Sequence, residues 1–231
     1  MIQQPDPIGK IELFKDRGHA AQLLARLLEP HRDTNAVILA VPRGGVPVGN
    51  LIARQLNLPM EILSCRKLTH PGDSKRSIGS VSLQEVVVHD NDRDIPQEYI
   101  QYAINRLRAS LRHKAKMYMS NGGIPDLKGK TVIVVDDWLS TGDTILAGLR
   151  DIRRQQPGRI IVAAPIVTTQ AHKAVSREAD EVIFVVLDDA ARLPSRKYFP
   201  PVGDEEVMRL IKPEKRRPGY CDHETLTQQT Q

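Results

Sequence analysis

The sequence predicts an α/β fold built on a doubly wound, mostly parallel sheet flanked by helices. Apolar, β-branched segments at residues 36–41, 131–135, 159–167 and 181–187 suit parallel strands that are buried on both faces. Helical segments alternate with them, as right-handed strand–helix–strand crossovers require. The 231 residues, 40% hydrophobic and 26% charged, are enough for one sizeable core in a single domain.

The N-terminal part of the chain supplies the first strand–helix unit. After a loose arm at residues 1–10, leucines spaced along residues 16–28 predict a helix that faces a core. The strand at 36–41 is followed by the turn Pro42-Arg43-Gly44-Gly45 and by a helix at 46–56. Such a turn can present N–H groups and an arginine to an anion, although an ordinary turn with a surface arginine would look the same.

Two strands and a loop are predicted before the longest helix. A strand at 61–67 ends in the adjacent bases Arg66 and Lys67. Strand character resumes at 80–89 as a hairpin or a bent pair. Proline, glycine and repeated charges at 68–79 predict a mobile loop between them. The basic residues of this region either face an anionic substrate or form a solvated loop surface.

The longest helix is predicted at residues 96–119, between Pro96 and the stop Asn121-Gly122-Gly123. Its basic residues are spread around the helix, which favours a solvated face over a nucleic-acid surface. The net charge of +5 and the pI of about 9.3 suit anionic substrates and are also compatible with nucleic acid. Because the helix lacks a basic stripe, we expect no nucleic-acid partner.

The stretch from residue 131 to 149, TVIVVDDWLSTGDTILAGL, is the most informative in the chain. A buried strand ends in Asp136 and Asp137, and a small-residue loop then leads into a helix. The loop consists of Ser140, Thr141, Gly142, Asp143 and Thr144.

This order of groups suits a phosphorylated ribose. A loop that enters a helix N-terminus offers N–H groups and a positive dipole end to a phosphate, and Thr141 and Thr144 add hydroxyl donors. Asp136 and Asp137 can accept hydrogen bonds from vicinal hydroxyls. Each piece alone would fit a strand end or a helix cap, but open α/β sheets bind ligands at the carboxyl ends of their strands.

The C-terminal part contributes two strands, two helices and an irregular segment. Short helices are predicted at 169–179 and at 203–211. Residues 188–202 are irregular, because prolines break the segment beside Tyr198 and Phe199. Residues 213–231 are polar and glutamine-rich, which predicts a disordered tail.

Composition excludes several classes of protein. No apolar run approaches the length of a membrane span, and the N-terminus lacks a signal-peptide core, so we expect no membrane partner. The two cysteines, Cys65 and Cys221, lie far apart without metal-ligand spacing. Reduced thiols and a cytoplasmic location are therefore expected.

The segment VIVVDDWLSTGDT resembles the phosphoribosyl-pyrophosphate signature of the type I phosphoribosyltransferases. Three further segments resemble a group of uncharacterised bacterial phosphoribosyltransferase-like proteins: VPRGGVPVG, RKL with PG and SIGSV after it, and GDEEV. The resemblance covers about residues 11–212. It implies a phosphoribosyltransferase domain with a flexible lid at about 68–79 and a small C-terminal hood at about 188–202.

The resemblance implies transfer of phosphoribosyl from its pyrophosphate donor to a nitrogen acceptor, with release of pyrophosphate. The residues expected in catalysis are Asp136, Asp137, Arg43 and Lys67. The residues expected to bind substrate are Ser140, Thr141, Gly142, Asp143, Thr144, Gly44, Gly45, Arg66, Tyr198 and Phe199. Mg²⁺ is expected as cofactor, held by the donor and water without a direct protein ligand, with Asp136 and Asp137 acting through water.

Five positions bear on the acceptor and the donor. In hypoxanthine-guanine enzymes the positions that match Ser140 and Thr168 are an Asp and a Lys, so weak or no activity with hypoxanthine and guanine is expected. In the hood, Tyr198 and Phe199 either stack on a planar base or pin the segment onto the core. Asp143 either points outward and caps the following helix, or points inward and weakens binding of the ribose phosphate.

Two functions of different class follow from the resemblance. One is an enzyme whose acceptor is a nucleobase-like compound. The other is a non-catalytic regulator that senses phosphoribosyl pyrophosphate or a nucleotide. A chemically equipped lid favours the enzyme, while the basic helix weakly favours the regulator. A homodimer is expected in either case.

Overall fold

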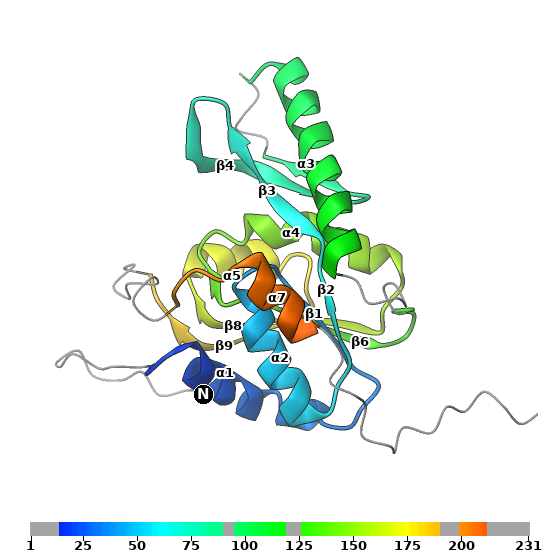
Figure 1. The fold of residues 1–231 in the computed structure, drawn as a ribbon, viewed down its shortest axis with the longest axis vertical. Helices are drawn as coiled ribbons and strands as arrows, with labels where there is room; N and C mark the ends of the chain where they lie inside the picture. The colour runs from blue at the N-terminus through cyan, green and yellow to red at the C-terminus, as the bar shows by residue number, and fades with distance from the viewer. Residues whose placement is uncertain (1–13, 90–94, 119–125, 190–198, 212–231) are drawn as a thin grey trace, which may run out of the picture.

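A parallel sheet forms the centre of the protein (Figure 1). The structure is a computed structural model, and it describes residues 14–89, 95–118, 126–189 and 199–211. The strands in spatial order are β2 (Met60–Ile62), β1 (Val37–Ala40), β6 (Thr131–Val135), β8 (Arg159–Val167) and β9 (Glu181–Leu187), and every neighbouring pair is parallel. The short β7 (Trp138–Leu139) pairs with the end of β8. The predicted parallel sheet is confirmed.

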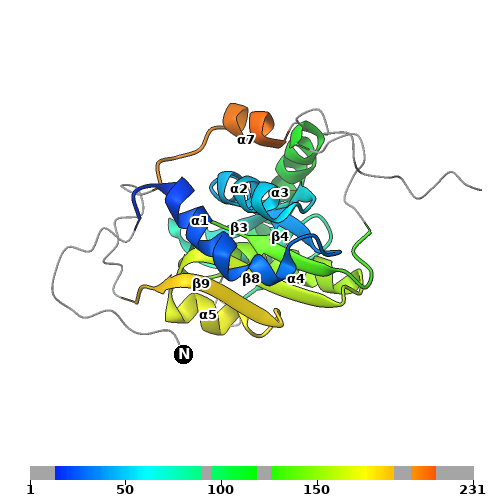
Figure 2. The same ribbon diagram turned by 90° about the horizontal axis from the view of Figure 1, so that it is seen from below.

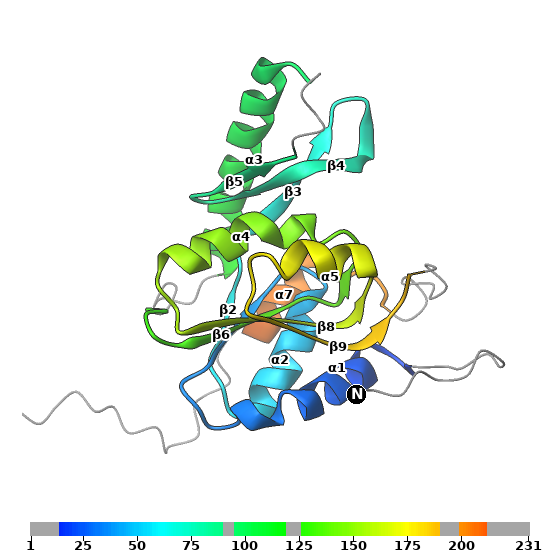
Figure 3. The same cartoon turned by 180° about the vertical axis from the view of Figure 1, so that it is seen from behind.

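Helices cover both faces of this sheet (Figures 2 and 3). One face is covered by α1 (Arg17–Leu27) and α2 (Gly45–Leu56), and the other by α4 (Asp143–Arg154) and α5 (Thr169–Val175). Along β6, Val132 and Val134 pack toward α4 and α5, while Ile133 and Val135 pack toward α1 and α2. Because successive strand residues face opposite sides, a strand covered on both faces must be apolar throughout. The doubly wound arrangement is confirmed.

A second, smaller layer projects from one side of the sheet (Figures 1 and 3). It consists of the antiparallel strands β3 (Cys65–His70), β4 (Asp73–Ser82) and β5 (Val86–Val88), with the long helix α3 (Gln97–Tyr118). It has its own hydrophobic cluster, which contains Leu68, Ile78, Val81, Ile95, Ile100, Ile104 and Leu111. The hairpin predicted at residues 80–89 and the long helix are confirmed.

The predicted strand at 61–67 is wrong as one element. The chain leaves the parallel sheet after Ile62 and enters the antiparallel sheet at Cys65. The break exists because the two halves pair with strands of different sheets, which local strand propensity does not distinguish.

The predicted loop at 68–79 is also wrong. These residues form most of a β-hairpin, paired from Cys65 with Ser82 to His70 with Asp73. Leu68 and Ile78 are fully buried and anchor its base, while Lys75 and Arg76 are exposed toward its tip. The two buried apolar side chains and the paired backbone hold the segment in an ordered hairpin. Its proline, glycine and charged residues therefore indicate a tight turn rather than a mobile loop. Closure of this hairpin over a substrate stays a prediction.

Two short helices are predicted in the C-terminal part of the chain. The helix predicted at 169–179 ends early, at Val175, because the chain turns there to enter β9. The last helix, α7 (Asp204–Ile211), lies against α2 and the end of α3 (Figure 2). Val207 is fully buried in that contact, and Asn50 Nδ2 donates to Leu210 O at 2.9 Å.

Several predictions fall outside the described residues. These are the arm at 1–10, the tail at 213–231, Tyr198 and most of the hood at 188–202. Across the described ranges, no helix combines the length and apolarity that a bilayer crossing needs.

Candidate active site

The acidic pair and the glycine turn meet at the carboxyl end of the sheet. Asp136 and Asp137 follow β6, and the turn of residues 42–45 follows its parallel neighbour β1. Val41 N donates to Val135 O at 2.8 Å, which continues the pairing beyond the strands. Two loops that lie about 90 residues apart in sequence therefore lie side by side at one edge of the sheet. Open parallel sheets bind their ligands at this edge.

The two glycines of the turn allow this close approach. A Cβ on Gly44 would lie 2.1 Å from Asp137 Oδ2, and a Cβ on Gly45 would lie 2.5 Å from Val135 O. No side chain fits at either distance, so the backbone of the turn reaches the acids only because both residues are glycine. The peptide bond between Pro42 and Arg43 is cis.

Replacing Gly45 by alanine is expected to lower the free energy of unfolding by about 1–3 kcal/mol, because the backbone of β6 must move away from the new methyl group. Thermal unfolding measures the change. The matched control is Gly72→Ala, where the nearest atoms to a Cβ belong to the His70 ring at 3.6 Å. Equal melting temperatures for the two variants would contradict the close approach at Gly45.

Asp136 lies in an environment that opposes its charge. Burial and the neighbouring Asp137 raise the pKa of Asp136 well above its ordinary value, while Arg17 acts in the opposite direction. Asp137 N donates to Asp136 Oδ1 at 2.8 Å, which fixes the carboxyl orientation. Two acids are thus held side by side although this raises the pKa of Asp136. Strongly shifted pKa values of this kind are typical of functional sites.

Arg17, a residue that the sequence analysis missed, binds the second acid of the pair. Its Nη2 lies 2.9 Å from Asp137 Oδ2, and its Nε also donates there at 3.3 Å. The same Nη2 donates to Pro200 O at 2.9 Å, and the guanidinium lies 5.4 Å from the centroid of the Phe199 ring. The side chains of Arg17 and Asp137 are only 12% and 19% exposed. No local pattern marks this arginine among the 33 basic residues.

The predicted phosphate loop leads into α4 as expected. Gly142 precedes the helix with a φ of +78°, which favours glycine. Ser140 is exposed, and Thr141 and Thr144 are half-buried. Thr168 closes the loop from the next strand, because its hydroxyl donates to Ser140 O at 2.6 Å while accepting from Ala171 N.

Asp143 does not point outward, because the residue is only 7% exposed. Whether it weakens binding of the ribose phosphate stays a prediction. Its Oδ1 lies 3.1 Å from Nε2 of His89, the residue after β5. The acid therefore joins the loop to the antiparallel layer, a long-range contact that the local sequence does not reveal.

Of the three predicted cations, Arg43 lies in the glycine turn, and Arg66 and Lys67 lie in β3. Arg43 is half-exposed, and its Nη1 lies 3.9 Å from Asp204 Oδ1 of α7. Burial and the hydrogen bond to Asp204 raise the pKa of the Tyr118 phenol, while the charges of Arg43 and Arg66 act in the opposite direction. Lys67 follows Arg66 in the strand and leaves from its opposite face. The roles of Arg66 and Lys67 at the diphosphate stay predictions.

Phe199 packs into the core in the described structure. It is 6% exposed, and its ring lies 6.1 Å from that of Phe14 with Arg17 over it. The packing alternative therefore holds for Phe199, and its predicted stacking on a base is wrong for this conformation. The reason is that an aromatic ring beside prolines gains more from a core contact than from solvent.

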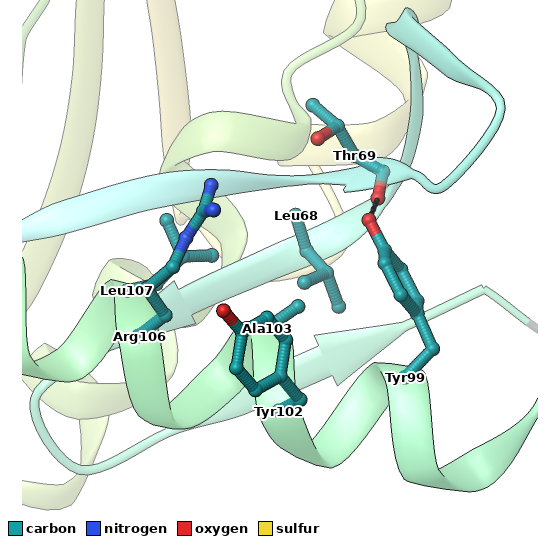
Figure 4. Close-up of a pocket in the computed structure, with 7 residues that line it drawn as sticks. All are labelled: Leu68, Thr69, Tyr99, Tyr102, Ala103, Arg106 and Leu107. Carbon is teal, nitrogen blue, oxygen red and sulfur yellow. Dashed lines mark hydrogen bonds between the residues drawn. The ribbon is translucent and has the colours of Figure 1, made fainter.

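A small cavity lies elsewhere, between α3 and β3 (Figure 4). Its volume is about 70 Å³, well below the range of about 300–1,000 Å³ typical of ligand pockets. Tyr99 closes one end, since its hydroxyl donates to Thr69 O at 3.1 Å. No lining residue belongs to the acidic pair or to either loop, so the strand ends remain the candidate site.

The residues at the site suit a magnesium ion held mainly by its substrate. Within the described ranges, no three His, Cys, Asp or Glu side chains gather as a metal site. Asp137 is engaged by Arg17 and Asp136 by a backbone N–H, yet each carboxylate retains acceptor capacity. This set fits contact through water rather than a protein-built cage.

Comparison with known proteins assigns the fold and the family. The phosphoribosyl transferase domain matches residues 12–192. The solved structure of TT1426 from Thermus thermophilus is similar, with 31% identity, a TM-score of 0.71, and coverage of 86% of this chain and 97% of that one.

Two curated relatives are similar in sequence. Rv0571c of Mycobacterium tuberculosis (strain H37Rv), whose name describes it provisionally as a phosphoribosyl transferase, is 26% identical over 207 residues, which is 87% of this chain and 47% of that protein. The chain thus spans about half the length of this relative. A uracil phosphoribosyltransferase of Aquifex aeolicus (strain VF5) is 32% identical over 82 residues, or 35% of this chain and 39% of that protein.

The domain match covers most of the chain, and the Thermus structure shares its fold along nearly the whole of that protein. The acids and the two loops that the sequence singled out lie within the matched residues. The chain belongs to the phosphoribosyl transferase domain family.

Proposed function

We propose that this protein is a phosphoribosyltransferase, which uses phosphoribosyl pyrophosphate and Mg²⁺ to transfer phosphoribosyl to a nitrogen acceptor and releases pyrophosphate. One observation carries the proposal. The acidic pair lies directly against the glycine turn, and the phosphate loop follows the pair. Ribose hydroxyls, diphosphate and ribose phosphate then each have a complementary partner along one sheet edge.

The mechanism follows from the charges that develop in the reaction. Breaking the anomeric bond leaves positive charge on the ribose and negative charge on the departing diphosphate. Asp136 and Asp137 stabilise the first, and Arg43, Arg66 and the N–H group of Gly44 stabilise the second. The N–H group of Gly45 donates to Val41 O at 3.0 Å. When bound, Mg²⁺ neutralises the diphosphate oxygens.

The acceptor is proposed to be a nucleobase-like compound other than a 6-oxopurine. Thr168 stands where the hypoxanthine-guanine enzymes have a lysine, and its hydroxyl is committed to Ser140 O and to the first turn of α5. It carries no charge that could select a ring oxygen. Release of pyrophosphate, measured across a panel of nucleobases, tests the reaction and identifies the acceptor.

Phosphoribosyl pyrophosphate with Mg²⁺ is expected to raise the melting temperature, because a ligand that binds only the folded state stabilises it. Glucose 6-phosphate, which carries one phosphate and no diphosphate, is the control and should give no shift. An equal shift with both compounds would contradict the donor site. Donor binding without pyrophosphate release from any base would favour the alternative, a non-catalytic sensor.

A further inference from the structure

The carboxylate of Asp204 is bound by cationic and hydroxyl groups from two other elements. Lys114 Nζ lies 3.0 and 3.1 Å from its two oxygens, and the Tyr118 hydroxyl donates to Oδ1. Arg43 Nη1 lies 3.9 Å from the same Oδ1. Hydrogen bonds from Tyr118 and Lys114 lower the pKa of Asp204, so the group is ionised at neutral pH. We call Arg43, Lys114 and Tyr118 the anion cluster.

Helix α7 holds Asp204 in this position. Val207, one turn along the helix, is fully buried with Val46 and Tyr118, and Asn50 anchors the far end of α7. Val46 belongs to the first turn of α2, directly after the glycine turn. The contact between Asp204 and the anion cluster is thus built into the packing of α7 on α2, the helix that the glycine turn enters.

The anion cluster has the chemistry of a phosphate site. An ammonium, a phenol and a guanidinium supply more donors than one carboxylate can use, and together they suit a group with several anionic oxygens. Arg43 also belongs to the glycine turn, in which the N–H group of Gly44 is a proposed partner of the diphosphate. An anion on that turn and the carboxylate of Asp204 would therefore compete for the same arginine.

We propose that the anion cluster binds the outer phosphate of the diphosphate group, and that Asp204 occupies the cluster as an internal competitor when no ligand is bound. The ligand's identity rests on the proposed function. Binding of the diphosphate displaces the Asp204 carboxylate from Arg43 and Lys114, so the packing of α7 sets the affinity for the donor. Lys114, which lies outside both loops, becomes a donor-binding residue.

Asp204→Asn tests the proposal in the full-length protein, with inorganic pyrophosphate as the probe in titration calorimetry. Removing the competing charge is expected to tighten pyrophosphate binding about tenfold, the scale of one partly screened charge interaction. The variant without ligand should be less stable, because Lys114 loses its ionic partner. A merely structural role of Asp204 predicts the same loss of stability with unchanged or weaker binding.

Glu205→Gln is the matched control, since it removes the same charge from the neighbouring, exposed residue of α7. Its pyrophosphate affinity should stay within about twofold of the wild type. Adding Lys114→Gln to Asp204→Asn should abolish the gain in affinity. If both single variants tighten binding equally, the effect is general charge and the proposal is wrong.

The outcomes also separate the inference from the proposed function. If the wild type binds pyrophosphate and Asp204→Asn binds no more tightly, the inference fails while the function stands. If Asp204→Asn binds more tightly but no base yields product with phosphoribosyl pyrophosphate, the inference stands and the transferase fails. If neither protein binds pyrophosphate, both are overturned.

Discussion

Replacing Asp136 and Asp137 together by asparagine is expected to lower the affinity for phosphoribosyl pyrophosphate at least about 100-fold. Asparagine keeps the shape of each side chain and removes its charge. Hydrogen bonds to charged groups contribute about 1.5–3 kcal/mol each, and two of them to ribose hydroxyls account for a loss of this size. Titration calorimetry at fixed Mg²⁺ measures the change. Unchanged affinity would show that the pair is only a strand end.

The two single variants separate this role from stability. The pKa of Asp136 is raised by burial and by Asp137, so the folded state holds its proton more tightly than the unfolded chain does. Asp136 therefore contributes favourably to the free energy of unfolding at a pH below its pKa in the unfolded chain, about 4. This contribution is lost as the pH rises through its pKa in the folded state. Asp136→Asn should then raise the melting temperature at neutral pH, with a gain that fades toward pH 4.

Asp137→Asn serves as the matched control in the same measurement. It should lower the melting temperature, since it leaves the largely buried Arg17 without its ionic partner. Both variants should lose donor affinity. If the two variants change the melting temperature in opposite directions but both weaken donor binding, the acids act by binding the donor rather than by packing. Two variants that change stability in the same direction would contradict the electrostatic account.

The strands of the parallel sheet could be predicted from the sequence because their burial on both faces leaves a continuous apolar run. The bounds of β6, β8 and β9 match the predicted segments for that reason. The carboxyl ends of the strands could be predicted as the ligand-binding edge, but the pairing of β1 with β6, which brings the glycine turn to the acidic pair, is seen only in the structure. Gly44 and Gly45 then confirm how closely the loops approach.

The hairpin at 68–79 could not be predicted, because its turn residues and charges are those of a mobile loop. Only the pairing of β3, β4 and β5, together with the packing of α3, decides that Leu68 and Ile78 are buried. The packing of Phe199 depends in the same way on Phe14, which lies at the other end of the chain. Contacts between residues far apart in the chain leave no periodic pattern in the local sequence, so they cannot be predicted from it.

The charged contacts of the site were missed for a related reason. Arg17 is 120 residues from Asp137, and Lys114 is 90 residues from Asp204. Each lies on a helix whose pattern explains it as an ordinary surface residue. The motif GDEEV indicated that Asp204 lies in a segment shared with similar proteins, but the motif alone did not indicate its partners.

Arg17→Gln is expected to weaken donor binding about tenfold and to move its pH dependence. Arg17 is the positive charge that lowers the pKa of the Asp136 carboxyl, so its removal raises that pKa further. Because the ionised pair accepts the ribose hydroxyls, the acidic limb of the binding profile should shift to higher pH. Arg26→Gln, an exposed change of the same charge on the same helix, is the control and should leave the profile in place.

A merely structural role of Arg17 would lower stability and leave the pH profile unmoved, so the profile decides between the two roles. Arg17→Lys sharpens the comparison, because lysine restores the charge without the paired donors that reach Asp137 and Pro200 O. The lysine variant should recover the position of the acidic limb but only part of the affinity. Full recovery of both would show that charge alone matters, and recovery of neither would show that Arg17 acts by packing against Phe199.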